Sequence, residues 1–494
     1  MKISGVILTR LVIVAIILLS FFTFAENYYP LLTSDMAVNI LMTPSFSLPH
    51  DIYFWGQDRS GNLIPMIAHT VFTLSGCPPV LIVSFVHYLI LAAGFLALTR
   101  FVRSAFGRII LAMVWFFPPW HFLEFLLILY GIQTSLVLIA LNFLDRSFSA
   151  RLRWKCLSWL SGSCLIFIVA VWVSDMALGS ILALLITAVL YYTVAGKDRE
   201  KTISLRGMMV PAIFLAAWTV AGFLVLHYAK MISTPVQNYT NGFFAAPASV
   251  AANIHTVVIS VFKTLVFSSE SQIESVYALG LAVSLILLVY PIKKQAVRCI
   301  KITENPWFYF FLFEAILTVA AVILSRWVAA NGTGRRYFTT FFISSWICLI
   351  LLLENQPKNK WRKSLQIALA VVVMTGSLSG CFRFYYPEVK PSRIRVIAAL
   401  KSMGDIGIIA EYWNAYMVAS PDPLHIKATP HDKDFVRNPN LVIEVFAQPK
   451  IYLVKDGWLE SFPDTIVQFG RMLRKKGRSF HIADDCINRY VLIR

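Results

Sequence analysis

Charged residues are scarce in this sequence. Only 14% of its 494 residues are Asp, Glu, Lys or Arg, whereas 58% are hydrophobic, and the mean hydropathy is +0.68. A water-soluble protein of this length has too little polar surface to cover so many apolar side chains, so most of the chain must face lipid. The scarcity of charge excludes an ordinary soluble enzyme.

Acidic residues are scarcer than basic ones, with 26 against 44 and a formal net charge of +18. The basic residues gather in five short loops between apolar runs, around residues 100–108, 146–155, 197–206, 293–301 and 358–363. Short basic loops are typical of the cytoplasmic side of a membrane protein. The distribution of basic residues therefore predicts the membrane topology, and few basic residues remain that could form a nucleic-acid site.

Several motifs are missing. The seven cysteines form no C-x-x-C pair, which excludes a zinc ribbon or a thioredoxin-like motif. No H-E-x-x-H motif, internal repeat or low-complexity tract is present. We therefore predict no resident metal site, although a divalent metal ion stays an open alternative because Asp, Glu and His side chains are suitable ligands.

Long apolar runs dominate the sequence. The first follows Lys2 and Arg10 as a signal peptide would, but no small-residue cleavage site precedes Glu26, so we expect a retained helix. Eleven spans are predicted, at residues 8–25, 78–99, 109–118 (or extended toward 127), 124–144, 156–174, 176–195, 208–227, 275–291, 307–325, 338–354 and 365–381. With a cytoplasmic N-terminus, eleven spans place the C-terminus outside. Residues 254–267 form a short apolar segment with Lys263, which indicates an interfacial or re-entrant helix.

The remainder of the chain has a different pattern. Strand-like runs (GIIAEYW, LHIKA, LVIEVF, KIYLVK, RYVLIR) alternate with helical stretches (SRIRVIAALKSMG, DTIVQFGRMLRKKG). The predicted fold is therefore a multi-pass α-helical membrane domain, residues 1–382, followed by a small extracytoplasmic α/β domain, residues 383–494.

The polar residues of the predicted outer loops are unevenly distributed. Acidic or basic side chains fall near the outer ends of the spans, at Asp35, Asp58, Arg59, His121, Asp175, Arg335 and Arg336. Ionisable groups at membrane depth are costly, so their gathering at one interface is a functional-site hypothesis. Carboxylates can accept a proton from a nucleophile, and arginines match phosphate oxygens.

Each residue also has an ordinary structural explanation. Asp35 follows Thr33-Ser34 and could start a helix, while Asp58 and Arg59 could form a local turn contact. Asp175 could be a solvated turn, and His121 could hydrogen bond at the membrane interface. Arg335 and Arg336 could anchor lipid headgroups.

Three motifs carry a resemblance to a known family. The acidic first outer loop (TSDMA, then WGQDRSGNLIP), the late GRRYF and the outer α/β tail resemble the GT-C class of integral-membrane glycosyltransferases, in the bacterial branch similar to protein mannosyltransferases and lipid A aminoarabinose transferases. The resemblance implies that Asp35 is the base and that Arg336 with Tyr337, next to Arg335, binds the donor phosphate. Met36 stands where that family has a second acidic residue, so the base stays open between Asp35 and Asp58.

The resemblance implies an enzyme that transfers a hexosyl or pentosyl group from a polyprenyl-phosphate donor to a lipid, glycan or protein acceptor, with inversion. It implies location in the inner (plasma) membrane, with no nucleic-acid partner. A flippase or transporter of lipid-linked sugars is the alternative; it would need repeats and ionisable residues deep within spans, and the sequence shows none clearly. A structural protein whose outer domain binds partners is the third hypothesis.

Overall fold

The computed structural model describes residues 5–24, 32–57, 60–150, 152–198, 205–233, 244–266, 272–293, 300–385 and 393–493, and the account below concerns these residues. The chain forms two compact units. The helical unit comprises Met1–Ser20, Ile90–Leu226 and Asn238–Glu388, and the mixed unit comprises Phe21–Leu89, His227–Gln237 and Val389–Arg494. The predicted domain division after residue 382 stays a prediction.

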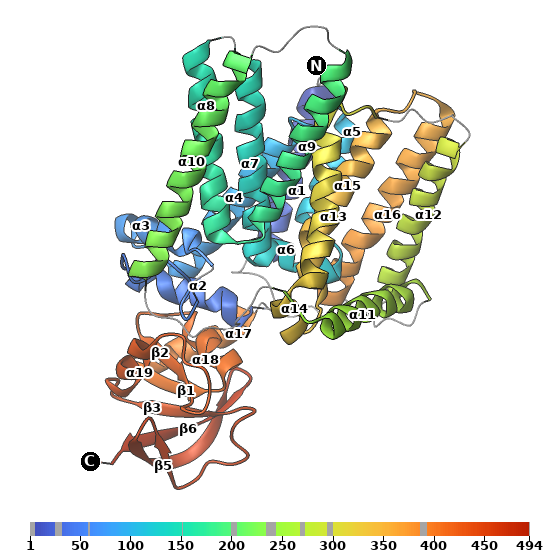
Figure 1. Ribbon diagram of the computed structural model, residues 1–494. Coiled ribbons are helices and arrows are strands. Elements are labelled where there is room, and N and C mark those ends of the chain that lie inside the picture. The colour runs from blue at the N-terminus through green and yellow to red at the C-terminus, as the bar shows by residue number, and fades with distance from the viewer. Residues whose placement is uncertain are drawn as a thin grey trace. The chain divides into compact units, whose positions relative to one another are not determined.

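The helical unit is a bundle of long apolar helices (Figure 1). Its members, some of which extend into the mixed unit, are α1 (Gly5–Phe24), α4 (Pro79–Leu98), α5 (Ala105–Phe116), α6 (Glu124–Leu127), α7 (Leu129–Ser149), α8 (Arg153–Val173), α9 (Ala177–Asp198), α10 (Leu205–Ile232), α11 (Pro247–Leu265), α12 (Gln272–Lys293), α13 (Pro306–Leu324), α14 (Arg326–Ala330), α15 (Thr339–Glu354) and α16 (Lys360–Tyr385), with the short 3-10 turns η1 (Trp120–Phe122) and η2 (Arg335–Phe338). Helix α7 packs on α8, α13 on α9 and α15, and α12 on α16.

These helices make the chain a multi-pass membrane protein. Among the described residues, eight helices are long and apolar enough to cross a membrane, or nine if one bent pair counts as a single span. Each of the eleven predicted spans overlaps at least one helix of the bundle, and seven of them overlap one of the eight candidates; the eighth candidate is α11. Apolar residues turn outward along them, as on α10, where Val220, Phe223 and Leu224 are exposed.

The prediction for residues 109–144 was wrong in detail. Helix α5 ends at Phe116, and the chain bends by 77° into η1 and α6. A second break at Ile128, whose backbone is extended, separates α6 from α7. Pro118 and Pro119 lie at the first bend, where neither can donate a backbone hydrogen bond. At the second break, a Cβ on Gly131 would lie 2.0 Å from the Phe125 carbonyl oxygen. Only glycine therefore allows the start of α7 to lie this close to α6.

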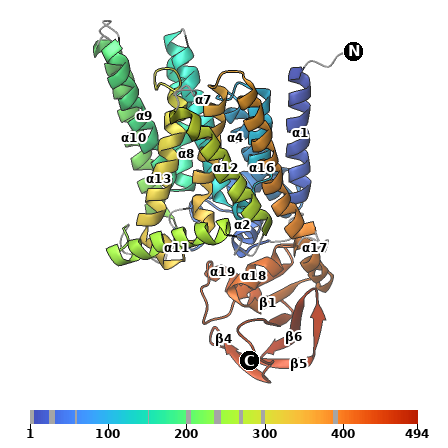
Figure 2. The same cartoon turned by 90° about the vertical axis from the view of Figure 1, so that its right-hand side faces the viewer.

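Helix α11 contains the segment predicted to be interfacial. By length and composition it is among the eight candidate spans. Both views, however, show it crosswise to its neighbours at one end of the helical unit (Figures 1 and 2). Ile254, Val258 and Phe262 are 46%, 58% and 60% exposed, which suits a helix whose apolar side enters a membrane surface. Its interfacial placement stays a prediction.

Ionisable residues lie buried within spans, contrary to the sequence-based reading, and Glu314 is one of them. Glu314 of α13 is only 4% exposed. Its carboxyl oxygens accept hydrogen bonds from Ser180 Oγ of α9 and Ser344 Oγ of α15, each at 2.6 Å. Because a buried carboxyl group needs such partners, these bonds join three helices.

The mixed unit combines two early helices with an α/β sheet. Its elements are α2 (Ser34–Ser45), α3 (Leu63–Ser75), α17 (Arg393–Ile397), η3 (Ala398–Met403), β1 (Ile406–Ala410), α18 (Tyr412–Ala419), β2 (Ile426–Pro430), α19 (Pro439–Phe446), β3 (Ile451–Lys455), β4 (Thr465–Gln468), β5 (Arg471–Ile482) and β6 (Asp485–Leu492). The strand order is β2-β1-β3-β6-β5-β4, in which the first three strands are parallel. Ile409, Leu453 and Val445 belong to the core that joins the sheet to α19.

Two predicted elements of this α/β region were wrong. LVIEVF forms helix α19 because Asn438 caps it, Pro439 occupies its first turn, and Leu441 and Val445, four residues apart, are buried together. DTIVQFGRMLRKKG forms the β4–β5 hairpin rather than a helix. Phe469 and Gly470 have φ values of 53° and 72°, which is the backbone of a tight two-residue hairpin turn.

We expect the contact between α4 and α7 to depend on Gly94. A Cβ at this position would lie 2.3 Å from Ser135 Cβ and 2.5 Å from Ser135 Cα. Gly94→Ala should therefore push the helices apart and lower the free energy of unfolding by about 1–3 kcal/mol. The thermal midpoint of the purified protein in detergent measures this. Gly179→Ala in α9, where nothing lies within 4 Å of the added Cβ, is the control, and equal midpoints for both variants would contradict the expectation.

Candidate functional site

Asp35 lies in the first turn of α2, in the mixed unit. Thr33 caps this helix by accepting a hydrogen bond from Met36 N, and a carboxylate near a helix N-terminus is favoured by the helix dipole. The Asp35 side chain is 45% exposed, and its Oδ1 lies 2.9 Å from Nη2 of Arg437. The structure thus places the predicted base at an accessible position in an ion pair.

Arg437 comes from the segment between β2 and α19 and is 6% exposed at its side chain. Nη1 donates to the Trp55 carbonyl at 3.1 Å, and Nε donates to the Tyr412 hydroxyl at 2.6 Å. The guanidinium lies over three rings, with Cζ 4.9 Å from the Phe54 centroid, 5.3 Å from Tyr412 and 5.9 Å from Phe435. Hydrogen bonds and cation–π contacts together fix its orientation.

The polar loop that follows α2, residues 46–62, is held by its own hydrogen bonds. Asp51 accepts hydrogen bonds from Ser47 N at 2.8 Å and from Trp55 Nε1 at 2.9 Å. Asn62 Nδ2 donates to the Asp51 carbonyl at 2.8 Å. These bonds hold Trp55, and hence the carbonyl that accepts from Arg437. The other predicted residues of this loop, Asp58 and Arg59, lie outside the described residues.

In the helical unit, His121 meets a carboxylate from a distant part of the chain. His121 Nε2 lies 2.5 Å from Oε2 of Glu274, at the start of α12, and the His121 backbone N–H donates to Oε1 at 3.2 Å. Arg335 Nη1 lies 3.6 Å from the same Oε2, and its Nη2 donates to Thr264 Oγ1. Glu274 is 3% exposed, so a buried carboxylate brings together two of the predicted residues.

Arg336 and Tyr337 form a second contact in the helical unit. Arg336 Nη2 donates to the Tyr337 hydroxyl at 3.2 Å, and the guanidinium lies over the Tyr337 ring. Tyr337 belongs to an apolar cluster against which Tyr130 and Met176 pack. Asp175, the neighbour of Met176, is exposed at the turn between α8 and α9. Arg336 also interacts electrostatically with Glu124, so both arginines have an acidic neighbour.

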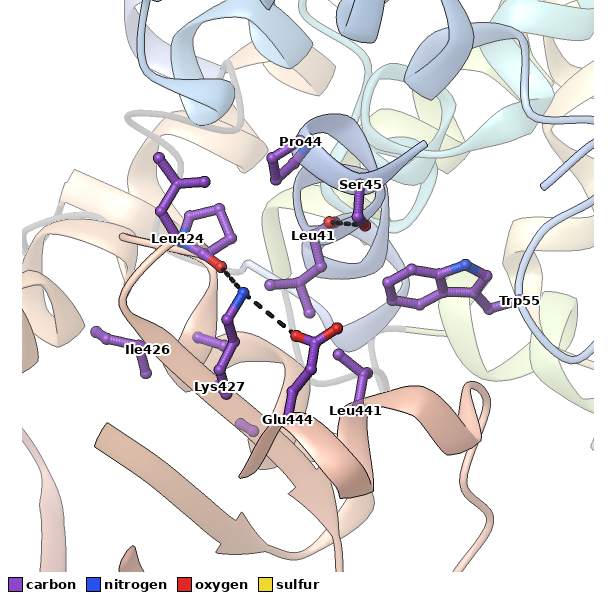
Figure 3. A pocket seen from close by; sticks show the side chains of 12 residues that line it. Leu41, Pro44, Ser45, Trp55, Leu424, Ile426, Lys427, Leu441 and Glu444 are labelled. Carbon is purple, nitrogen blue, oxygen red and sulfur yellow. Dashed lines mark hydrogen bonds and ion pairs between the residues drawn. The ribbon is translucent and has the colours of Figure 1, made fainter. Parts of the chain in front are cut away.

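A cavity of about 200 Å³ lies in the mixed unit, between α2 and the α/β sheet (Figure 3). Leu41, Pro44 and Trp55 line one side, and Leu424 and Leu441 line the other. A single ion pair, Lys427 Nζ to Glu444 Oε2 at 3.2 Å, forms part of its wall. The cavity is therefore mainly apolar, with one charged pair that can bind a polar group.

Acidic side chains gather at the carboxyl ends of β1 and β3. Asp456 follows β3 and accepts hydrogen bonds from the Glu411 backbone N–H and from Asn414 Nδ2. Asn414 Nδ2 also donates to Asp485 Oδ1 at 3.0 Å. Burial, followed by the neighbouring charges of Glu411 and Asp485, raises the pKa of Asp456 to about 6. In the described part of the chain, no group of three His, Cys, Asp or Glu side chains is arranged to hold a metal ion.

Sequence reasoning did not identify Arg437, Tyr412 or Glu274 as parts of a site. The signal at Arg437 was weak, because HDKDFVRN reads as a charged loop. The strongest available hint was the density of aromatic residues at both partners, in YFW at 53–55 and EYW at 411–413.

The raised pKa of Asp456 predicts a pH effect on stability. Its folded-state pKa of about 6 lies above the ordinary pKa of an aspartate side chain, 3.8, so the folded state holds the proton more tightly. The resulting stabilisation is complete below about pH 4 and is lost as the pH rises through about 6. The thermal midpoint of the native chain should therefore fall relative to that of Asp456→Asn between pH 4 and pH 7. Asp422→Asn, which changes an exposed contact with His425, is the control; parallel midpoint curves for native chain and Asp456→Asn would contradict the assignment.

Comparison with known proteins shows the fold. No family model matches the sequence, and no curated protein matches it. The structure is similar to ArnT from Cupriavidus metallidurans in its apo state, with a TM-score of 0.56 and 9% identity over 97% of both chains. It is also similar to the same enzyme bound to undecaprenyl phosphate, with a TM-score of 0.53 and 11% identity over 97% of both. An oligosaccharyltransferase from Archaeoglobus fulgidus gives a TM-score of 0.45 and 12% identity, over 91% of this chain and 69% of that one.

The similarity to ArnT extends over almost the full length of both chains, membrane part and C-terminal part together. The fold expected from the GT-C resemblance is therefore confirmed: this chain has the fold of a GT-C membrane enzyme.

Proposed function

We propose that this chain is a glycosyltransferase that moves a sugar from a polyprenyl-phosphate donor to a lipid, glycan or protein acceptor. The observation that supports this most directly is the shared fold with ArnT over 97% of both chains, since that enzyme has been solved with undecaprenyl phosphate. Fold alone does not define activity. The accessible carboxylate of Asp35 and the outer arginines supply the chemistry that such a reaction needs.

In this proposal, Asp35 accepts the proton of the acceptor hydroxyl. The acceptor oxygen forms a bond to the anomeric carbon while the bond from that carbon to the phosphate oxygen breaks, which inverts the configuration. The phosphate leaves as an anion, and no nucleotide or redox partner is required. Proton removal by a positioned carboxylate is general base catalysis.

Arg336 is the proposed principal ligand of the donor phosphate, with Tyr337 orienting it and Arg335 adding positive charge. Arg335 contacts Glu274, and Arg336 contacts the hydroxyl and ring of Tyr337 and interacts electrostatically with Glu124. A guanidinium presents paired donors to phosphate oxygens and stabilises the charge of the leaving group.

The remaining predicted residues have subordinate roles in the proposal. His121 is held by Glu274 and orders the loop that follows α5. Asp175 and Arg59 are candidate contacts to the sugar or its phosphate, and Asp58 is the alternative base. The chemistry of the hydroxyl and the phosphate is the same whether the sugar is a hexose or a pentose.

The proposed location is the inner (plasma) membrane. The N-terminus is cytoplasmic and the α/β region, residues 383–494, is extracytoplasmic, because the basic clusters lie in short loops that the positive-inside rule assigns to the cytoplasm. The transfer then takes place on the extracytoplasmic side.

Replacing Asp35 by Asn tests the base. The amide keeps the shape of the side chain but accepts no proton, so the rate of transfer from a labelled undecaprenyl-phosphate sugar, tried with hexose and pentose donors, should fall by about 10²–10⁴-fold. Transfer is measured in membranes with matched protein levels. Asp484→Asn is the control, because Asp484 also pairs with an arginine, Arg393 at 2.6 Å, in the same unit. Full activity in Asp35→Asn, with loss in Asp58→Asn, would move the role of base to Asp58.

Replacing Arg336 by Ala tests the donor site. Losing one guanidinium contact to phosphate should raise the KM for the donor about tenfold or more, because a charged hydrogen bond contributes about 1.5–3 kcal/mol. Arg100→Ala, which removes an arginine paired with Asp145, controls for the loss of positive charge alone. An unchanged KM and kcat in Arg336→Ala would exclude this residue from the phosphate site.

A further inference from the structure

The contact between Arg437 and Asp35 joins positions 402 residues apart. It lies entirely within the mixed unit. From it we infer that Arg437 is a positioning residue for the reaction: it holds the Asp35 carboxylate in the orientation from which the other oxygen takes the acceptor proton. This inference rests on the proposed function of Asp35 and gives the α/β region a part in positioning the base.

The guanidinium is itself immobilised. The Arg437 backbone N–H donates to the Tyr416 hydroxyl at 2.9 Å, and Tyr412 and Trp55 fix its side-chain nitrogens. Burial of Arg437 to 6% exposure excludes water from these bonds. An arginine held at three nitrogens can hold a carboxylate with little further loss of entropy.

The segment that carries Arg437 is anchored on both sides. Asp434 Oδ2 accepts the Tyr412 backbone N–H at 3.0 Å, which ties the segment to α18. Phe435 fits against Gly56 in the loop after α2: a Cβ on Gly56 would lie 2.8 Å from the Phe435 ring. Gly56 also has a positive φ of 71°, so this close approach requires glycine on two grounds.

The contact occupies one carboxylate oxygen of Asp35 and leaves the residue 45% exposed. The structure records no partner for Oδ2 among the described residues, so this oxygen can receive the acceptor hydroxyl. A carboxylate that rotated freely would present Oδ2 in the productive direction only part of the time. Misplacement of a reacting group by about 1 Å can cost about 100-fold in rate.

The stereochemistry distinguishes Arg437 from the phosphate-binding arginines. In an inverting displacement the base and the leaving group lie on opposite faces of the sugar. An arginine in contact with the base is therefore on the acceptor side, and its charge is already matched by Asp35. Arg437 should accordingly affect kcat rather than the KM for the donor.

The test compares the full-length native chain with Arg437→Ala, using transfer from the undecaprenyl-phosphate sugar on which the native chain is active. We expect kcat to fall about 100-fold, the KM for the donor to change less than about threefold, and added guanidinium or methylguanidinium chloride at millimolar concentration to restore at least a tenth of the lost rate. Arg437→Lys keeps the charge but loses the fork and the ring contacts, and should be less active than the native chain and more active than Arg437→Ala. Arg471→Ala is the matched control, since this exposed arginine lies 4.5 Å from the Phe446 ring in the same unit.

The outcomes separate the two proposals. Transfer by the native chain with equal kcat in Arg437→Ala overturns the positioning role and leaves the proposed function intact. A loss of activity that accompanies a collapsed thermal midpoint and is not restored by guanidinium in Arg437→Ala, with Arg437→Lys equally inactive, shows a merely structural arginine and also overturns the role. No transfer by the native chain with any lipid-linked sugar overturns the proposed function itself.

Discussion

The hydrocarbon interior of a membrane supplies no hydrogen-bond partners, and this constraint governs most of the structure. Backbone groups within it must bond to each other, which makes every long apolar segment a helix. The same rule applies to side chains. Glu314 lies within a span only because Ser180 and Ser344 donate to both of its oxygens. Where the chain leaves the helical pattern, at Pro118–Pro119 and Ile128, it does so in short turns at the ends of helices.

The membrane part of the fold was predictable because one physical signal decides it. Runs of apolar residues located a helix for each predicted span, and loop charge suggested their direction. The signal fails where helices are short, as in the bend after Phe116. It also fails in the α/β region, where a short apolar run suits a strand or a buried helix equally. The N-cap Asn438 and Pro439 in the first turn favour a helix for α19. The turn with Phe469 at positive φ could not be inferred from residue type.

The site was predictable only in part. Asp35 stood out because a carboxylate next to a membrane span needs an explanation, and the structure places it in the first turn of α2. Its partner could not be inferred, because nothing in the local sequence of Arg437 indicates which distant residue it meets. The same is true of His121 and Glu274, which are 153 positions apart. Local patterns show which residues need partners, and only the tertiary fold supplies them.

The anchoring of Phe435 against Gly56 has a consequence for protein engineering and for evolution. A solved structure with this fold, that of ArnT, is only 9% identical to this chain, so the shared fold does not guarantee that the C-terminal regions can be exchanged. In this chain the loop after α2 and the segment before α19 are complementary in shape, because the Phe435 ring packs directly on Gly56. A chimera that exchanges the α/β region must therefore carry residues 35–56 with it. In homologous sequences, substitutions in these two segments should covary.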